Sequence, residues 1–338
     1  MRIAILSPIA WRTPPRAYGP WELVASHLTE GLLEAGHDVT LFATADSRTR
    51  ARLEAVAPAP YEEDKSLDPK VWECLHIAHL MEQADQFDLI HNHFDFLPLT
   101  YSRLITTPMV TTIHGFSSPK ILPVYRRYND RVHYISISDA DRSAEIDYLA
   151  TVYNGVDPEQ FTFVPRGREY LLFLGRIHRD KGTREAIWIA RTVGLPLVIA
   201  GIVQDQRYFN RYVEPEIDGT SIRYVGPAGP ELRDRLLGNA LALLHPINFD
   251  EPFGLTVVES MLTGTPVIAI KRGSMGELIL DGETGFLVGD AREAADAARR
   301  LSRDPDTIDR RRCREWAMER FTVSRMVEGY LRAYEAVL

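Results

Sequence analysis

Two glutamates bracket a short segment whose residue types could bind a phosphorylated ligand. Residues 251–259 read Glu-Pro-Phe-Gly-Leu-Thr-Val-Val-Glu, and we expect a helix from Gly254 to about Met261. The first N–H groups of a helix lack backbone partners and the helix dipole is positive there, so a helix start attracts phosphate. Glu251 precedes this anion site and Glu259 lies inside the helix. The arrangement suits a ligand with phosphate in its middle and a hydroxyl-bearing sugar at each end, as in a nucleotide-sugar.

Each glutamate also has a simpler explanation. Glu251 could interact with the helix dipole, and Glu259 could lie on an exposed helix face. However, Val257, Val258 and Met261 indicate that much of this helix is buried. A buried carboxylate needs hydrogen-bond donors, and ribose hydroxyls would supply them.

Two cations follow the first expected strand in the second half of the chain. Arg176 comes soon after the apolar run 171–174, and Lys181 precedes Gly182, where the next helix is expected to open. Arginine offers a planar fork to phosphate oxygens and lysine offers a point charge. An isolated pair would be interpreted as solvated surface cations, but the position after a strand end favours phosphate binding.

A histidine ends an expected strand in the first half of the chain. Gly115 follows His114 and lets the backbone turn, which would direct the imidazole toward the ligand-binding edge of the sheet; a purely structural role is the alternative. Asp139 and Asp141 are expected to cap a helix. Two histidine pairs have no third candidate ligand nearby in the sequence, so we assign no metal site: His91 with His93, and His76 with His79.

The loop of residues 11–20 is stiff and basic. It holds Arg12, Arg16 and three prolines, which suits a binding loop, although a plain surface loop is an equal alternative. If these arginines face the ligand, they would favour a carboxylate or phosphate, or an anionic membrane surface that presents one. A second basic segment follows Gly115 and holds Lys120, Arg126, Arg127 and Arg131.

Composition excludes some functions and leaves others open. The net charge of −8, from 39 basic and 47 acidic residues, argues against a nucleic-acid-binding protein. The two cysteines, Cys74 and Cys313, lie far apart, so a reducing cytoplasm is expected. The N-terminus reads as a buried strand rather than a signal peptide, and no apolar run approaches the roughly 20 residues that span a bilayer. Peripheral contact with the inner face of the membrane stays open.

Apolar runs alternate with amphipathic stretches, which predicts an α/β fold with parallel sheets and crossover helices. The clearest helix is expected at residues 21–33, with Gly36 as its stop. A segment containing two prolines at 157–168 divides the chain into expected domains 1–160 and 161–321, each a doubly wound, Rossmann-like sheet, and the two would face each other across a deep cleft. Helices with a bend near Phe321 are expected from about residue 307. Strands are expected at 3–7, 39–43, 89–91, 110–113, 134–137, 171–174, 197–200, 222–225, 241–245, 267–270 and 285–288.

Together these features resemble the retaining glycosyltransferases of family 4, which have the two-domain GT-B fold. The first loop resembles most the branch that contains an avilamycin-pathway glycosyltransferase. It departs from the family pattern at Pro20, which replaces a second glycine and removes a backbone donor. The matching segments span nearly the whole chain: Tyr18-Gly19, His114-Gly115, residues 154–157, Gly175-Arg176, Lys181-Gly182, residues 251–259, Gly276-Glu277, Asp281-Gly282 and residues 284–286.

The resemblance implies a role for each candidate residue. Arg176 and Lys181 would hold the donor diphosphate, and Glu259 would bind the ribose. Glu251 and His114 would be catalytic and would meet the donor sugar from the second and the first domain. The last helix, from about residue 322 to 338, would return to the first domain. The implied donor-binding residues are Gly19, Arg176, Lys181, Phe253, Gly254, Leu255 and Glu259.

We therefore expect a retaining hexosyltransferase that needs no metal and no other cofactor, because the cations and the helix start supply the positive charge. A UDP-sugar is the first choice of donor and GDP-mannose the second. The acceptor, expected to contact Arg12 and Arg16, is a small molecule, a glycan or a lipid-linked acceptor, and the sequence does not identify it. The alternatives are a nucleotide-sugar epimerase or sugar phosphorylase of the same fold, and a non-catalytic sugar-nucleotide sensor.

Overall fold

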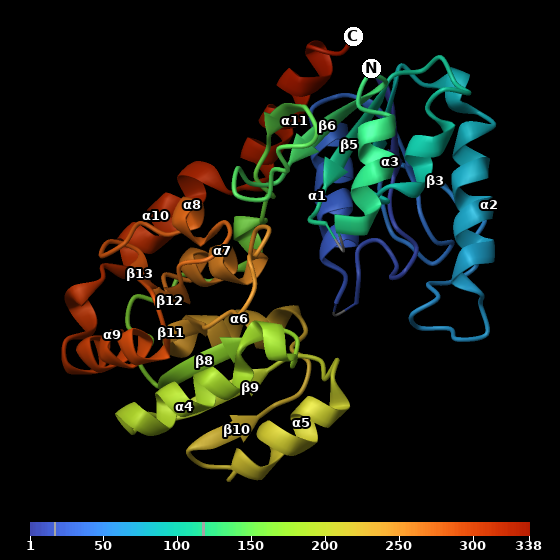
Figure 1. The fold of residues 1–338 in the computed structure, drawn as a ribbon. Coiled ribbons are helices and arrows are strands. Elements are labelled where there is room, and N and C mark those ends of the chain that lie inside the picture. Colours follow the sequence, from blue (N-terminus) through green and yellow to red (C-terminus); the bar gives the residue numbers. More distant parts are fainter. Residues whose placement is uncertain (17, 117–118) are drawn as a thin grey trace. The chain divides into compact units, whose positions relative to one another are not determined.

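The computed structural model describes residues 1–16, 18–116 and 119–338, which form two compact units. Unit 1 consists of Met1–Gly155 with Val323–Leu338, and unit 2 consists of Val156–Thr322. Each unit is a parallel sheet with helices packed against it (Figure 1). The division between the units lies just before the proline-containing segment 157–168.

The sheet of unit 1 has seven strands in the order β3-β2-β1-β4-β5-β6-β7. Its central strands are buried on both faces; Ile5 of β1, for example, lies between Leu41 and His91 and is fully buried. All neighbouring strands run parallel, so their carboxyl ends share one edge of the sheet. The strands are β1 (Arg2–Leu6), β2 (Asp38–Phe42), β3 (Arg52–Glu54), β4 (Leu89–Asn92), β5 (Met109–Ile113), β6 (Val132–Ser136) and β7 (Tyr148–Thr151).

The first and last helices of unit 1 pack against each other. Gly31 of α1 permits a close approach, since a Cβ there would lie 2.5 Å from Cγ2 of Val327 on α11. Gly36 ends α1 in the left-handed conformation, with φ of 85°, and donates its N–H to the carbonyl of Leu33. The helices are α1 (Pro20–Glu34), α2 (Pro69–Met81), α3 (Leu122–Arg127) and α11 (Val323–Glu335).

Unit 2 repeats this architecture with six parallel strands in the order β10-β9-β8-β11-β12-β13. The strands are β8 (Tyr170–Leu174), β9 (Leu197–Ala200), β10 (Ile222–Tyr224), β11 (Ala240–His245), β12 (Val267–Ile270) and β13 (Gly285–Val288). The helices are α4 (Thr183–Val193), α5 (Gln206–Tyr212), α6 (Pro230–Asn239), α7 (Leu255–Leu262), α8 (Met275–Leu278), α9 (Ala291–Arg303) and α10 (Arg310–Arg320).

The structure contains every expected strand, with small differences at the strand ends, and the α/β prediction is confirmed. The break predicted near Phe321 separates α10 from α11. Two short strands were missed, β3 and β7, because both lie at sheet edges and are largely exposed or only half-buried. The helix expected after Asp139 is wrong: the segment between β6 and β7 forms turns, in which Asp141 donates its N–H to Oγ of Ser138.

One arginine of α10 joins several segments of unit 2. Arg310 is 7% exposed, and its guanidinium donates to the carbonyls of Val164, Gly167, Gly238 and Ala240 at 2.7 to 3.0 Å. Burial lowers the pKa of this guanidinium to about 10, so the side chain stays protonated at neutral pH. The arginine therefore satisfies carbonyls that would otherwise be buried without donors.

We expect Arg310→Met to destabilise unit 2 by at least about 3 kcal/mol, because several buried carbonyls lose a charged donor at once. Hydrogen exchange of the slowest amides in β8 and β11 measures this loss, and the amides of β1 in unit 1 serve as an internal reference. The matched control is Arg311→Met, since Arg311 is exposed. Equal exchange in the two variants would contradict the structural role of Arg310.

Candidate functional site

The carboxyl end of β11 leads through a short loop to the start of α7. Gly254 is the N-cap of α7 and has φ of 102°, a left-handed conformation that strongly favours glycine. Residues 254–256 are partly exposed, whereas the rest of the helix is buried. Val257 donates its N–H to the carbonyl of Gly254, and the N–H groups before it have no partner within the helix. The helix start is thus accessible to an anion.

The loop before α7 is held by Gly273 and Ser274, which follow β12. Ser274 donates both its N–H and its hydroxyl to the carbonyl of Glu251 at 3.0 Å, and the hydroxyl also contacts the carbonyl of Phe253. A Cβ at Gly273 would lie 2.4 Å from the backbone nitrogen of Glu251, so only glycine fits. This contact was not predicted from the sequence, although a pair of small residues after a strand end is a usable signal.

Glu251 and Lys181 form a buried ion pair. Their side chains are 11% and 15% exposed, and Lys181 Nζ contacts Glu251 Oε2 directly. Nε2 of His245 lies 3.4 Å from the same oxygen but is not aligned to donate a hydrogen bond. Burial alone would raise the pKa of Glu251, but His245 and Lys181 outweigh it and lower the pKa to about 2. The carboxylate is therefore ionised at neutral pH.

The turn that carries Lys181 is fixed to the loop after β11. Asn248 donates its N–H to the carbonyl of Asp180 at 2.7 Å and its side-chain amide to the carbonyl of Arg179 at 3.1 Å. The Lys181 ammonium also lies 4.7 Å from the ring centre of Phe249. The structure thus brings Lys181, Glu251 and the start of α7 together.

Arg176 has a different neighbour. It follows β8 and Gly175, is partly exposed, and donates from Nη1 to the side-chain oxygen of Gln204. Gly201, at the end of β9, lies so close that a Cβ there would be 1.8 Å from the carbonyl oxygen of Gly175. Arg176 and Lys181 both follow β8, so they lie at the same edge of the sheet. Arg176 has no carboxylate partner among the described residues.

Glu259 lies inside α7 and is 2% exposed. Nη1 of Arg233, on α6, lies 3.1 Å from Oε1 of Glu259, whereas Oε2 has no hydrogen-bond partner in the described part of the chain. Burial raises the pKa of Glu259, and the charge of Arg233 opposes this. Arg233 was not predicted, because nothing in the sequence connects it with a glutamate on the next helix.

In unit 1, His114 follows β5 and is buried. Its Nε2 lies 2.9 Å from Nδ1 of His93, and its ring stacks on Trp21 of α1 with centroids 5.4 Å apart. Burial lowers the pKa of His114 to about 3, so the imidazole is neutral near pH 7. Gly115 has φ of 114°, which permits the sharp turn expected after the strand.

Gly19 shapes the first loop at the N-cap of α1. Its φ is 149°, and a Cβ there would lie 2.9 Å from Cβ of Pro15 and 3.0 Å from Oε2 of Glu22. The buried carboxylate of Glu22 accepts the N–H of Trp11 at 3.1 Å, and burial raises its pKa to about 7. Gly19 therefore lets the loop pack against the start of α1; contact with a donor stays a prediction.

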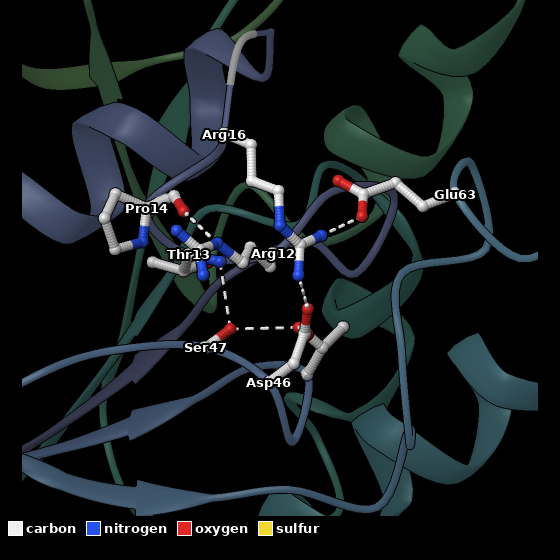
Figure 2. Close-up of polar contacts among 8 residues, drawn as sticks. Arg12, Thr13, Pro14, Arg16, Asp46, Ser47 and Glu63 are labelled. Carbon is white, nitrogen blue, oxygen red and sulfur yellow. Dashed lines mark hydrogen bonds and ion pairs between the residues drawn. The ribbon is translucent and has the colours of Figure 1, made fainter.

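The two arginines of the first loop differ in their partners (Figure 2). Arg16 pairs with Asp46 at 3.1 Å and with Glu63, so its charge is largely compensated. Arg12 donates Nε–H to the carbonyl of Pro14 at 3.0 Å, and its terminal nitrogens have no protein partner among the residues described. The loop is tied to the segment after β2 by the N–H of Thr13, which donates to Oγ of Ser47 at 2.9 Å.

Two arginines of the second basic segment also contact other residues of unit 1. Arg126 lies 3.1 Å from Glu145, and Arg131 donates to the carbonyls of Ser102 and Ile105 at 2.9 and 2.8 Å. The charge of Arg126 is therefore partly compensated, and the side chain of Arg131 is tied to the backbone of unit 1.

The two histidines of the other pair, His76 and His79, have protein partners. His76 contacts the carbonyl of Ser7 at 2.9 Å, and His79 contacts Glu54 at 3.0 Å. Within the ranges that the structure describes, no group of three or more His, Cys, Asp or Glu side chains is placed to hold a metal ion. In the same ranges, each helix is too short or too polar to cross a membrane.

Comparisons with known proteins find glycosyltransferases. A model of glycosyl transferases group 1 matches residues 159–320, and a model of glycosyltransferase family 4 matches residues 22–160. The chain is 28% identical to the glycogen synthase of Mycobacterium tuberculosis, over 92% of this chain and 88% of the relative.

Two solved structures share the fold over nearly the whole chain. AviGT4, a glycosyltransferase of avilamycin A biosynthesis, is 24% identical, with a TM-score of 0.74 over 99% of this chain and 97% of its own. Anabaena HepE, solved with UDP and glucose, is 20% identical, with a TM-score of 0.77 over 99% of this chain and 100% of its own. The predicted fold is therefore confirmed.

We expect Arg176→Ala to weaken binding of a nucleoside diphosphate at least about tenfold, because a charge-assisted hydrogen bond contributes about 1.5–3 kcal/mol. Calorimetric titration with UDP measures the change. Arg191→Ala is the matched control, since Arg191 lies in the last turn of α4, where it pairs with Glu216 and Asp218. Unchanged affinity in the Arg176 variant would remove this residue from the diphosphate site.

Proposed function

We propose that this chain, which belongs to the family 4 glycosyltransferases with the GT-B fold, transfers a hexose from a nucleotide-sugar with retention of the donor's anomeric configuration. The observation that carries the proposal is the meeting of three groups in unit 2. Lys181, in the turn after β8, lies together with ionised Glu251 and the accessible start of α7, which both follow β11. These groups match the charge pattern of a diphosphate that is attached to a sugar.

The diphosphate would bind at the start of α7. The N–H groups of residues 254–256 and the helix dipole favour an anion there. A phosphate oxygen would offer Lys181 a second anion beside Glu251, and Arg176 would approach from the end of β8. We propose that these cations and the helix start suffice, so that no metal ion is required.

The nucleoside would bind nearby through Glu259. Arg233 holds Oε1 of this carboxylate, and Oε2 is a buried acceptor without a partner among the described residues. A buried acceptor gains from a hydroxyl donor, and ribose offers two. We propose a UDP-sugar as the first donor to test, supported by HepE, which was solved with UDP and glucose, and GDP-mannose as the second.

The side chains assigned to catalysis are poor general bases. Glu251 has a pKa of about 2 and His114 a pKa of about 3, far below neutral pH. General-base catalysis works best when the pKa of the base lies near the working pH. The acceptor's proton would then pass to an oxygen of the departing diphosphate. This oxygen lies on the face of the sugar from which the diphosphate departs. Attack on that face retains the configuration.

This proposal predicts an α-linked product from an α-linked donor such as UDP-glucose. Proton NMR of the fresh product measures the anomeric coupling before any equilibration, with water as the acceptor if no other acceptor is known. A β-configured product would contradict retention. Absence of any turnover with a panel of UDP- and GDP-sugars would contradict the assignment of donor class.

The acceptor is proposed to carry a carboxylate or phosphate that contacts Arg12. Arg16 already has two carboxylate partners, so the proposal rests on Arg12, whose terminal nitrogens have no partner among the described residues. The ring of Pro14 and the bond from Thr13 to Ser47 restrict this loop, so that little entropy is lost on binding.

We expect Arg12→Gln to raise the acceptor KM about tenfold, because one charge-assisted contact is lost, and to leave donor hydrolysis nearly unchanged. Steady-state kinetics with acceptors that differ only in the anionic group measures this effect. Arg16→Gln is the matched control and should change the acceptor KM less. Equal losses in transfer and hydrolysis would contradict an acceptor role for Arg12.

A further inference from the structure

Three histidines lie side by side at the carboxyl edge of the unit 1 sheet. His91 belongs to β4, His93 follows β4 directly, and His114 follows β5. The rings of His91 and His93 are 4.1 Å apart, and those of His93 and His114 are 5.2 Å apart. The exposed fractions are 0% for His91 and His93 and 7% for His114. Nothing in the proposed function so far uses His91 or His93.

Both ring nitrogens of His91, at one end of this row, have hydrogen-bond partners. Nδ1 of His91 lies 2.6 Å from the hydroxyl of Tyr334, and Nε2 lies 2.8 Å from Oγ1 of Thr112. The hydroxyl of Tyr330 contacts the same Thr112 oxygen at 2.8 Å, so helix α11 fixes this end of the row. The backbone of His93 is fixed in turn, because its N–H donates to the carbonyl of Leu6 at 2.9 Å.

The hydrogen-bonded pair of His93 and His114 has two possible arrangements of its protons. The bond between His93 Nδ1 and His114 Nε2 needs one proton, and either ring can supply it. Nε2 of His93 and Nδ1 of His114 are buried and have no partner among the described residues. Burial lowers the pKa of both rings, well below its ordinary value for His93, so each ring is neutral and carries one proton.

The arrangements differ in where an unpaired N–H is left. If His114 donates, the second N–H of the pair lies on Nε2 of His93, deep in the fold, where it has no acceptor. If His93 donates, that N–H lies on Nδ1 of His114, and the unpaired atom of His93 is an acceptor. Each arrangement thus leaves one unpaired N–H, but His114 is 7% exposed whereas His93 is fully buried. A substrate oxygen that reaches His114 can therefore accept this N–H only in the second arrangement.

We infer that His93 is a positioning residue for the transfer reaction: it donates Nδ1–H to Nε2 of His114 and so holds His114 in the tautomer that presents Nδ1–H to a sugar hydroxyl oxygen. Stacking on Trp21 keeps the plane of the His114 ring fixed. The effect on transfer rests on the proposed function, whereas the tautomer of His114 does not.

The first test reads the tautomer directly in the full chain. With ¹⁵N-histidine labelling, long-range ¹H–¹⁵N NMR distinguishes a protonated ring nitrogen from an unprotonated one. We expect His114 to show a protonated Nδ1 and an unprotonated Nε2 at pH 7. The reverse pattern would overturn the inference, whatever the enzyme's activity.

The second test removes or replaces the donor. The amide nitrogen of asparagine lies close to the position of histidine Nδ1, so His93→Asn can still donate, whereas His93→Leu cannot. We expect the Leu variant to show a mixture of His114 tautomers and a kcat about tenfold lower, with little change in KM for the nucleotide-sugar. The Asn variant should keep the tautomer and most of kcat.

The matched control is His76→Gln. His76 is equally buried in unit 1 and bonds through Nε2 to the carbonyl of Ser7, a contact that glutamine can replace. This variant should leave the His114 signals unchanged. If His93→Leu keeps both the wild-type tautomer and the wild-type kcat, the positioning role is wrong. If the tautomer responds as expected but no donor is ever turned over, the proposed function fails and the assignment of the histidine pair stands.

Discussion

The contact between Lys181 and Glu251 constrains the rest of unit 2. Burying two opposite charges costs desolvation free energy, which offsets much of their attraction. Such a pair therefore persists only where its surroundings hold both partners in place. Asn248 fixes the turn before Lys181, and Ser274 fixes the backbone of Glu251. The pair lies beside the accessible start of α7. A second anion placed there would therefore meet groups that are already oriented.

The carboxyl edge of the unit 1 sheet carries a row of neutral groups. They are buried imidazoles whose pKa is lowered, and they are connected by hydrogen bonds to one another and to tyrosines of α11. Neutral donors and acceptors suit hydroxyl groups rather than phosphates. The packing of α11 on α1 near Gly31 gives the last helix a direct structural part in this edge.

The sequence predicted the fold well because buried parallel strands are nearly continuous apolar runs. The edge strands β3 and β7 were not predicted, because half-exposed strands lack such apolar runs. At the site, Glu251, Lys181 and Gly254 could be named because strand ends and helix starts bring them together. Arg233 and His93 could not, because their roles depend on contacts between segments far apart in the chain. The partners of Arg16, which compensate its charge, were hidden for the same reason.

A crystal structure with UDP bound would show whether the start of α7 holds the diphosphate. We expect the β-phosphate oxygens to accept hydrogen bonds from the N–H groups of residues 254–256. We also expect Nζ of Lys181 to contact a phosphate oxygen, and a ribose hydroxyl to lie within hydrogen-bond distance of Glu259. UDP bound away from the start of α7, with Lys181 still held only by Glu251, would show that this helix start is not the diphosphate site.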